Sequence, residues 1–119
     1  MKAVLLVSHG SHSPKTKKEV SVLVEQLKMN TDARIFEYAF LEIESPSIPE
    51  GIDICVQKGA CEVLVLLNFL NSGRHIDEDI PKIILAAKIK YPKVQLQMSP
   101  PVGQHEKIKD IFFDFIASH

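Results

Sequence analysis

Apolar and polar residues alternate in two different rhythms along this chain. Four short stretches, at 3–7, 33–41, 62–68 and 94–98, are continuously apolar or alternate residue by residue, which is typical of β-strands. The stretches between them repeat their apolar residues at intervals of three and four, which is typical of one face of an α-helix. A turn at the prolines 100–101 is expected to end the last strand.

Four amphipathic helices are expected, one after each strand. The first begins at Pro14, because proline suits the first helical position and a serine precedes it as N-cap. The second begins at the capping-box pair Ser47 and Glu50 and stops before Gly59. The third begins among the acidic residues before Pro81. The last helix has the cleanest apolar stripe in the chain, expected to be buried: Ile108, Ile111, Phe112, Phe115 and Ile116.

Strand and helix alternate four times within residues 1–119, which predicts one α/β domain. The runs at 3–7 and 62–68 are almost entirely apolar, as expected of strands buried on both faces of a parallel sheet. The predicted architecture therefore has three layers: a four-stranded parallel sheet with helices on both faces.

Composition narrows the functional classes. A net charge of −1 gives no general electrostatic basis for binding nucleic acid. No apolar run approaches the roughly 20 residues of a membrane span, and the one at the start stops at Ser8, too short for a signal peptide. We therefore expect a cytoplasmic protein with no membrane partner. Cys55 and Cys61 are expected to be buried free thiols.

Histidines follow two of the predicted strands, and such positions at the carboxyl ends of parallel strands commonly bind ligands. His9 follows the first strand and His75 follows the third. If the first strand lies between the second and third, these imidazoles converge, and Glu42 joins them from the second strand. Neighbouring strands lie about 4.8 Å apart, so both rings could share one metal ion or one substrate atom. His105, near the start of the last helix, is expected at the same rim.

Other interpretations of these residues remain open. A loop histidine is more often a surface residue than a ligand, and His12 and His119 are interpreted so. His105 is better explained by a helix start, and Glu42 equally well by an exposed carboxylate. The lysines within 15–18 form either a solvated helix face or a patch that attracts an anion.

The motifs and their order resemble the CbiX/SirB family of class II tetrapyrrole chelatases across almost the whole chain. The residues that carry this resemblance are Leu-Leu-Val-Ser-His-Gly-Ser at 5–11, Phe-Leu-Glu at 40–42, Pro-Ser at 46–47, Phe-Leu at 69–70, Gly-Arg-His at 73–75, Asp-Ile-Pro at 79–81 and Gly-Gln-His at 103–105.

The resemblance implies a chelatase-like fold, a flavodoxin-like half unit, in a single CbiX-type domain. It also implies an enzyme of the lyase class that inserts a divalent metal into sirohydrochlorin for cobalamin or siroheme biosynthesis. Cobalt is the favoured ion, with iron or nickel as alternatives. The metal is a substrate, and no permanently bound cofactor is expected. By the same resemblance, His9 and His75 handle the metal and carry the catalysis, and Glu42 lies near them.

Sirohydrochlorin carries several carboxylates, so its receptor needs local positive charge and hydrogen-bond donors. The expected substrate-binding residues are Ser8, Gly10, Ser11, Ser72, Gly73 and Arg74. Long members of the family contain two such units, so we also expect a homodimer. Phe113, off the apolar stripe of the last helix, is a candidate for its interface.

Two other functions compete with chelation. The Ser-His-Gly-Ser loop at 8–11 suggests a hydrolase or phosphatase, but the Gly-x-Ser-x-Gly elbow is absent and Arg74-His75 is followed by isoleucine rather than glycine. A non-catalytic metal-binding or regulatory module of the same fold remains open, because the fold alone does not determine activity.

Overall fold

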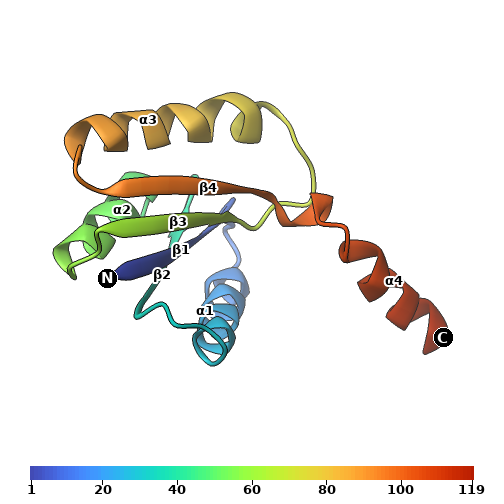
Figure 1. The fold of residues 1–119 in the computed structure, drawn as a ribbon. Coiled ribbons are helices and arrows are strands. Elements are labelled where there is room, and N and C mark those ends of the chain that lie inside the picture. The colour runs from blue at the N-terminus through green and yellow to red at the C-terminus, as the bar shows by residue number, and fades with distance from the viewer.

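A computed structural model describes residues 1–119 and contains one parallel sheet of four strands in the order β2-β1-β3-β4 (Figure 1). The strands are β1 (Lys2–Ser8), β2 (Ile35–Phe40), β3 (Glu62–Leu67) and β4 (Gln95–Pro101). The predicted fold class is therefore confirmed, including the condition on which the site depends, that β1 lies between β2 and β3.

The carboxyl ends of β1, β2 and β3 lie level with one another. Val7 of β1 is paired with Ala39 of β2 on one side and with Leu67 of β3 on the other. The loops that follow these strands therefore leave the sheet at one edge, side by side.

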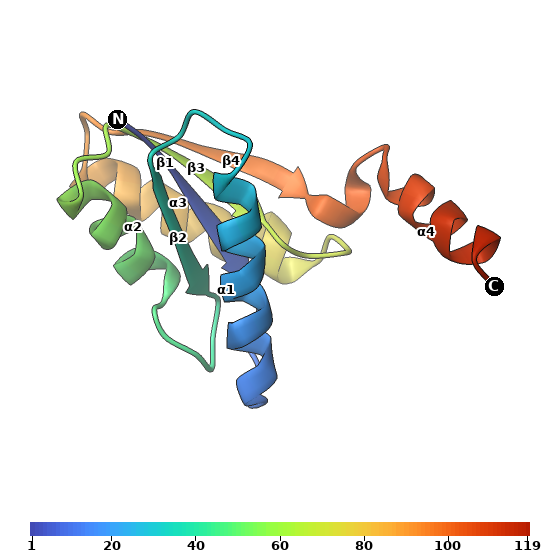
Figure 2. The same cartoon turned by 90° about the horizontal axis from the view of Figure 1, so that it is seen from below.

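Helices cover both faces of the sheet, as predicted. One face carries α1 (Pro14–Lys28), and the other carries α2 (Ile48–Gln57) and α3 (Ile80–Lys90) (Figures 1 and 2). Ser13 caps α1 by accepting a hydrogen bond from the Lys15 amide, and the predicted capping box at the start of α2 is present. A single turn of π-helix, η1 (His75–Asp79), precedes α3.

Successive residues of the central strand enter different cores. Ala3, Leu5 and Val7 belong to a core of 17 buried residues on the α2 and α3 face. Val4 and Leu6 point into a smaller core of 6 buried residues beneath α1. This division follows from the two-residue period of a strand and explains why β1 is apolar throughout.

The last helix contradicts the expectation that its stripe is buried. Figures 1 and 2 show α4 (Ile108–Ala117) projecting away from the sheet, joined to it through the short 3-10 turn η2 (Val102–Gln104). None of its residues is buried. Its large apolar residues between Ile111 and Ile116 are each 50–69% exposed. The periodicity predicted the helix correctly, but within one chain no surface covers it.

Two smaller expectations were also wrong. The turn after β4 begins later than expected, because Pro100 and Pro101 lie within the strand. β4 is an edge strand, where the missing proline amides disrupt pairing least, and the Leu67 amide donates instead to the Ser99 hydroxyl at 3.0 Å. Cys61 is exposed rather than buried, whereas burial raises the pKa of the Cys55 thiol to about 12.

None of the helices combines the length and the hydrophobicity that crossing a bilayer would require.

Candidate metal centre

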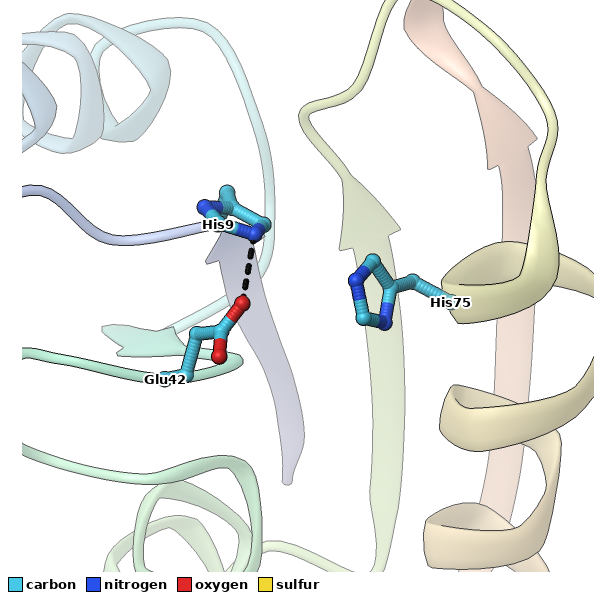
Figure 3. Close-up of side chains that lie close together, drawn as sticks. All are labelled: His9, Glu42 and His75. Carbon is cyan, nitrogen blue, oxygen red and sulfur yellow. Dashed lines mark ion pairs between the residues drawn. The ribbon is translucent and has the colours of Figure 1, made fainter.

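Three side chains from three different loops meet at the carboxyl edge of the sheet. His9 follows β1, Glu42 follows β2, and His75 begins η1 after β3. One potential ligand atom from each lies within 4.8 Å of the other two (Figure 3). His9 Nε2 is 2.7 Å from Glu42 Oε1, and the centroids of the two imidazole rings are 5.6 Å apart. The predicted convergence of these residues is therefore what the structure shows.

Backbone hydrogen bonds beyond the strands hold His9 beside Glu42. The Leu41 amide donates to the Ser8 carbonyl at 2.9 Å, and the Glu42 amide donates to the His9 carbonyl at 3.1 Å. Gly10 then turns the chain with a φ of +104°, and a Cβ at this position would lie 1.9 Å from the Glu42 carbonyl oxygen. Any other residue at position 10 would push the two loops apart.

The loop that carries Glu42 is tightly turned. The Glu44 amide donates to the Glu42 carbonyl at 2.8 Å across Ile43, whose φ is +73°. This is a γ-turn, with a backbone conformation that a β-branched residue rarely adopts. The Glu44 carboxylate accepts a hydrogen bond from the Ser11 amide at 2.8 Å, which ties the two loops together a second time.

His75 is held from the opposite side. Its Nδ1 lies 2.8 Å from the Asp79 carboxylate, one turn further along η1. Ile76, the next residue, is buried in the larger core and anchors the turn to the sheet. In Figure 3 the ring of His75 presents its other nitrogen toward His9 and Glu42.

The geometry suits a divalent ion that is held loosely. Two imidazoles and one carboxylate are ligands that cobalt, iron, nickel and zinc accept, and three protein ligands leave coordination positions open. All three residues are exposed to solvent, so an ion can enter and leave without a change in the fold. A closed cage of thiolates would retain the ion instead.

Comparisons with known proteins identify the family. The CbiX family profile matches residues 3–118, almost the whole chain. The chain belongs to the CbiX family. The resemblance expected from the motifs is thereby confirmed.

Relatives of this CbiX chain include proteins named for two metals. It is 34% identical over 116 residues to a sirohydrochlorin ferrochelatase of Priestia megaterium, covering 98% of this chain and 44% of that protein. It is 40% identical over 112 residues to a sirohydrochlorin cobaltochelatase of the same organism, covering 93% of this chain and 36% of that protein. Against a sirohydrochlorin cobaltochelatase of Methanococcus aeolicus the identity is 27%, and 96% of each chain is covered.

A solved structure matches the fold closely. The sirohydrochlorin chelatase SirB from Bacillus subtilis subspecies spizizenii, in complex with cobalt, superposes with a TM-score of 0.88 at 30% identity. The match covers 98% of this chain and 50% of SirB. The CbiX chain thus spans about half the length of SirB, and less than half of the Priestia proteins.

The six predicted substrate-binding residues of this CbiX chain have different surroundings. The Arg74 side chain is 82% exposed, with its Nε 3.9 Å from Glu78, and nothing crowds Gly73. Ser72 accepts a hydrogen bond from Gln104, and the Ser11 hydroxyl accepts one from the Ser13 amide. Ser8 is buried beneath the rim, where its hydroxyl accepts a hydrogen bond from the Asn68 side chain at 3.0 Å.

His105 is not part of the metal cluster. It lies between η2 and α4, rather than opening the last helix, and its Nδ1 accepts a hydrogen bond from the Lys107 amide at 3.0 Å. It lines a groove of 620 Å³ between α1 and the ends of β3 and β4, which we call the α1-side groove. His12 and His119 are also outside the cluster.

Two contacts at the site were not predicted from the sequence. Glu44 binds the Ser11 amide across 33 residues, and no local pattern signals such a long-range pair. Asp79 lies four residues after His75, a spacing that places two helical side chains on one face, so this contact could have been found.

Proposed function

We propose that this chain inserts a divalent metal ion into sirohydrochlorin, with His9, Glu42 and His75 delivering the ion. The observation that carries the proposal is the cluster itself, in which three potential ligand atoms from loops 33 residues apart lie within 4.8 Å of one another. The names of the relatives, sirohydrochlorin ferrochelatase and cobaltochelatase, support this substrate. Cobalt is the first ion to test, followed by iron and nickel.

The chemistry of metal insertion assigns a role to each group. The ion must be held weakly enough to transfer to the macrocycle, which neutral imidazoles with open positions permit. Two pyrrole protons must leave as the metal enters. An imidazole with an ordinary pKa near 6.5, or a carboxylate, accepts a proton at neutral pH. His9 and Glu42, already 2.7 Å apart, form a pair through which such a proton can pass.

The carboxylates of sirohydrochlorin would be bound around this centre. The Arg74 side chain is 82% exposed and only loosely paired with Glu78 at 3.9 Å, so it can turn toward an anion, and the amides near Gly10 and Gly73 are further donors. Ser11 and Ser72 offer hydroxyls at the same loops. Ser8, being buried, would act by supporting the end of β1 rather than by contact. Raising the salt concentration should therefore raise KM, whereas a KM indifferent to ionic strength would contradict this anion-binding role.

Anaerobic incubation with sirohydrochlorin and cobalt, followed by absorbance, tests the activity. We expect His9→Ala and His75→Ala each to lower the rate of insertion by at least about 100-fold, because each removes both a ligand and a base. His12→Ala is the matched control and should leave the rate unchanged. Near wild-type rates in both site variants would reject the assignment. Cobalt binding without insertion would instead indicate a metal-binding module.

The exposed last helix supports a homodimer as the working form. The apolar side chains of α4 have no cover in their own chain, and the α1-side groove is lined in part by Leu6, Leu23 and Leu66. SirB contains as much chain again beyond the half that matches, and a second copy would supply the same amount. We propose that α4 of one copy packs against the α1-side groove of the other. Phe113 is then one of several contacts, because it is 58% exposed and Phe112 and Phe115 are exposed to a similar degree, 56% and 61%.

Sedimentation at several protein concentrations tests the dimer. Phe112→Glu combined with Phe115→Glu places charges on the apolar side of α4 and should shift the protein to monomers. Lys109→Glu adds a negative charge to the same helix and should leave the dimer intact. A wild-type protein that is monomeric at assay concentrations would refute the proposal.

A further inference from the structure

We propose that Asp79 is a positioning residue of the metal centre, which holds the ring of His75 so that its Nε2 faces His9 and Glu42. This inference rests on the metal centre proposed above. The contact that carries it is the 2.8 Å distance between His75 Nδ1 and Asp79 Oδ2.

The turn that joins these two residues is built to keep them together. η1 is a π-helical turn in which the Ile80 amide donates to the His75 carbonyl, one residue further than in an α-helix. Ile76 and Ile80, which flank the acidic part of the turn, are both buried in the larger core. Asp79 is therefore fixed at the backbone on both sides, and its side chain is 39% exposed, less than that of His75.

The structure shows no other partner for the Asp79 carboxylate. Asp79 occupies the N-cap position of α3, yet its side chain makes no capping hydrogen bond. The nearby cation, Arg74, is paired with Glu78 instead. The only hydrogen bond or ion pair of the Asp79 side chain is with His75, so this carboxylate does not serve to cap the helix.

The chemistry of the contact determines which nitrogen of His75 is available. An ionised carboxylate can only accept a hydrogen bond, so Nδ1 must carry the proton and Nε2 is left with a free lone pair. A metal ligand needs that lone pair, and partners behind a ligating histidine commonly select the tautomer in this way. Figure 3 shows the second ring nitrogen of His75 on the side of His9 and Glu42, as this requires.

The two histidines are supported differently, which makes Asp79 specific to His75. His9 Nδ1 lies 3.2 Å from the carbonyl of Gly10, so the backbone supports that ring. The carboxylate nearest His9 is Glu42, itself a candidate ligand. Without Asp79, His75 has no equivalent support; its ring can rotate, and the tautomer with the proton on Nε2 becomes populated.

The first measurement is cobalt binding without any tetrapyrrole, by calorimetry or visible absorption. We expect Asp79→Ala to weaken cobalt binding by about 10- to 100-fold. Asp79→Asn should recover most of the affinity, because its amide oxygen still accepts a hydrogen bond from Nδ1. Asp77→Ala, which removes an exposed acid from the same turn, is the matched control and should bind as the wild type does.

The second measurement reads the tautomer directly, which a residue with a purely structural role would not change. Nitrogen-15 NMR of the metal-free protein at neutral pH should place the proton of neutral His75 on Nδ1 in the wild type and Asp79→Asn. The Asp79→Ala variant should show a mixture of tautomers. The wild-type spectrum remains decisive even if Asp79→Ala fails to fold, because a neutral His75 that carries its proton on Nε2 cannot donate from Nδ1 to Asp79.

Two results would overturn the inference: a wild-type His75 protonated on Nε2, or an Asp79→Ala variant that folds and binds cobalt as tightly as the wild type. The failure of the broader proposal looks different. A wild-type protein that binds no cobalt would reject the metal centre itself, whatever the tautomer of His75.

Discussion

The sequence clearly predicted both the side chains at the carboxyl rim of the sheet and helix α4, but the structure holds the rim residues together and leaves α4 exposed. At the rim, β1, β2 and β3 bring His9, Glu42 and His75 together, and backbone hydrogen bonds, a glycine turn and a buried isoleucine hold them there. α4 has an apolar side as regular as any in the chain, and none of it is buried. A pattern of side chains can specify a helix or a strand, but only contacts with neighbouring elements determine where it packs.

The largest effect on stability is expected at Gly10, where the rim leaves least space for an added side chain. Gly10→Ala would bring a Cβ to within 1.9 Å of the Glu42 carbonyl and would require a positive φ. The two loops must separate, so we expect a loss of roughly 3 kcal/mol or more in the free energy of unfolding. Cobalt binding should be lost with it. Urea denaturation and cobalt titration measure both.

Gly73→Ala is the matched control for that experiment. It lies at the third loop of the same rim, but nothing is within 4 Å of the added methyl group. Its effect on the free energy of unfolding should stay within about 1 kcal/mol. Equal losses in the two variants would show that glycine matters here only for chain flexibility.

Substituting one isoleucine in the body of the protein and one in α4 compares how much each region contributes to stability. Ile52 in α2 is buried and Ile111 in α4 is half-exposed. In dilute protein, where monomers prevail, Ile52→Ala should cost about 2–5 kcal/mol and Ile111→Ala less than about 0.5 kcal/mol. At concentrations that favour the proposed dimer, the cost of Ile111→Ala should increase. A cost that is large at every concentration would mean that α4 packs within its own chain.

Strain at the rim predicts a smaller, stabilising change. Ile43 has a φ of +73° and is half-exposed. Asparagine tolerates this conformation better, so Ile43→Asn should raise the free energy of unfolding by about 1 kcal/mol. Thermal or urea unfolding provides the measurement. A loss of stability would show instead that the Ile43 side chain makes contacts worth more than the strain.

The smallest expected effect lies away from both regions and depends on pH. A hydrogen bond from the Tyr91 hydroxyl, assisted by Lys90, lowers the pKa of Asp53. A carboxylate whose pKa is lower in the folded state adds stability above its unfolded pKa of about 4, and that stability is lost as the pH falls through the folded value. Tyr91→Phe should therefore lower stability slightly at pH 7 and flatten its decline below about pH 4. An unchanged acid profile would contradict this linkage.

The elements were predictable because their signals are local. The structure contains the predicted strands and helices, the N-cap before Pro14 and the capping box at Ser47, and departs from the expected bounds most clearly at the end of β4. The site residues were predictable one step later, since the positions of His9 and His75 at strand ends imply convergence once the strand order is known. The contact between Glu44 and Ser11 could not be predicted, because it depends on how two loops fold over each other.

The sequence by itself determined a four-stranded α/β fold and pointed to the three side chains that we propose form the metal centre. It did so because backbone periodicity and side-chain type are properties of neighbouring residues. The tertiary structure alone decided that β1 lies between β2 and β3, that Glu44 accepts a hydrogen bond from the Ser11 amide, and that α4 stands apart from the sheet. Those outcomes depend on which surfaces the other elements already cover, because burial is a property of the whole fold rather than of any one segment.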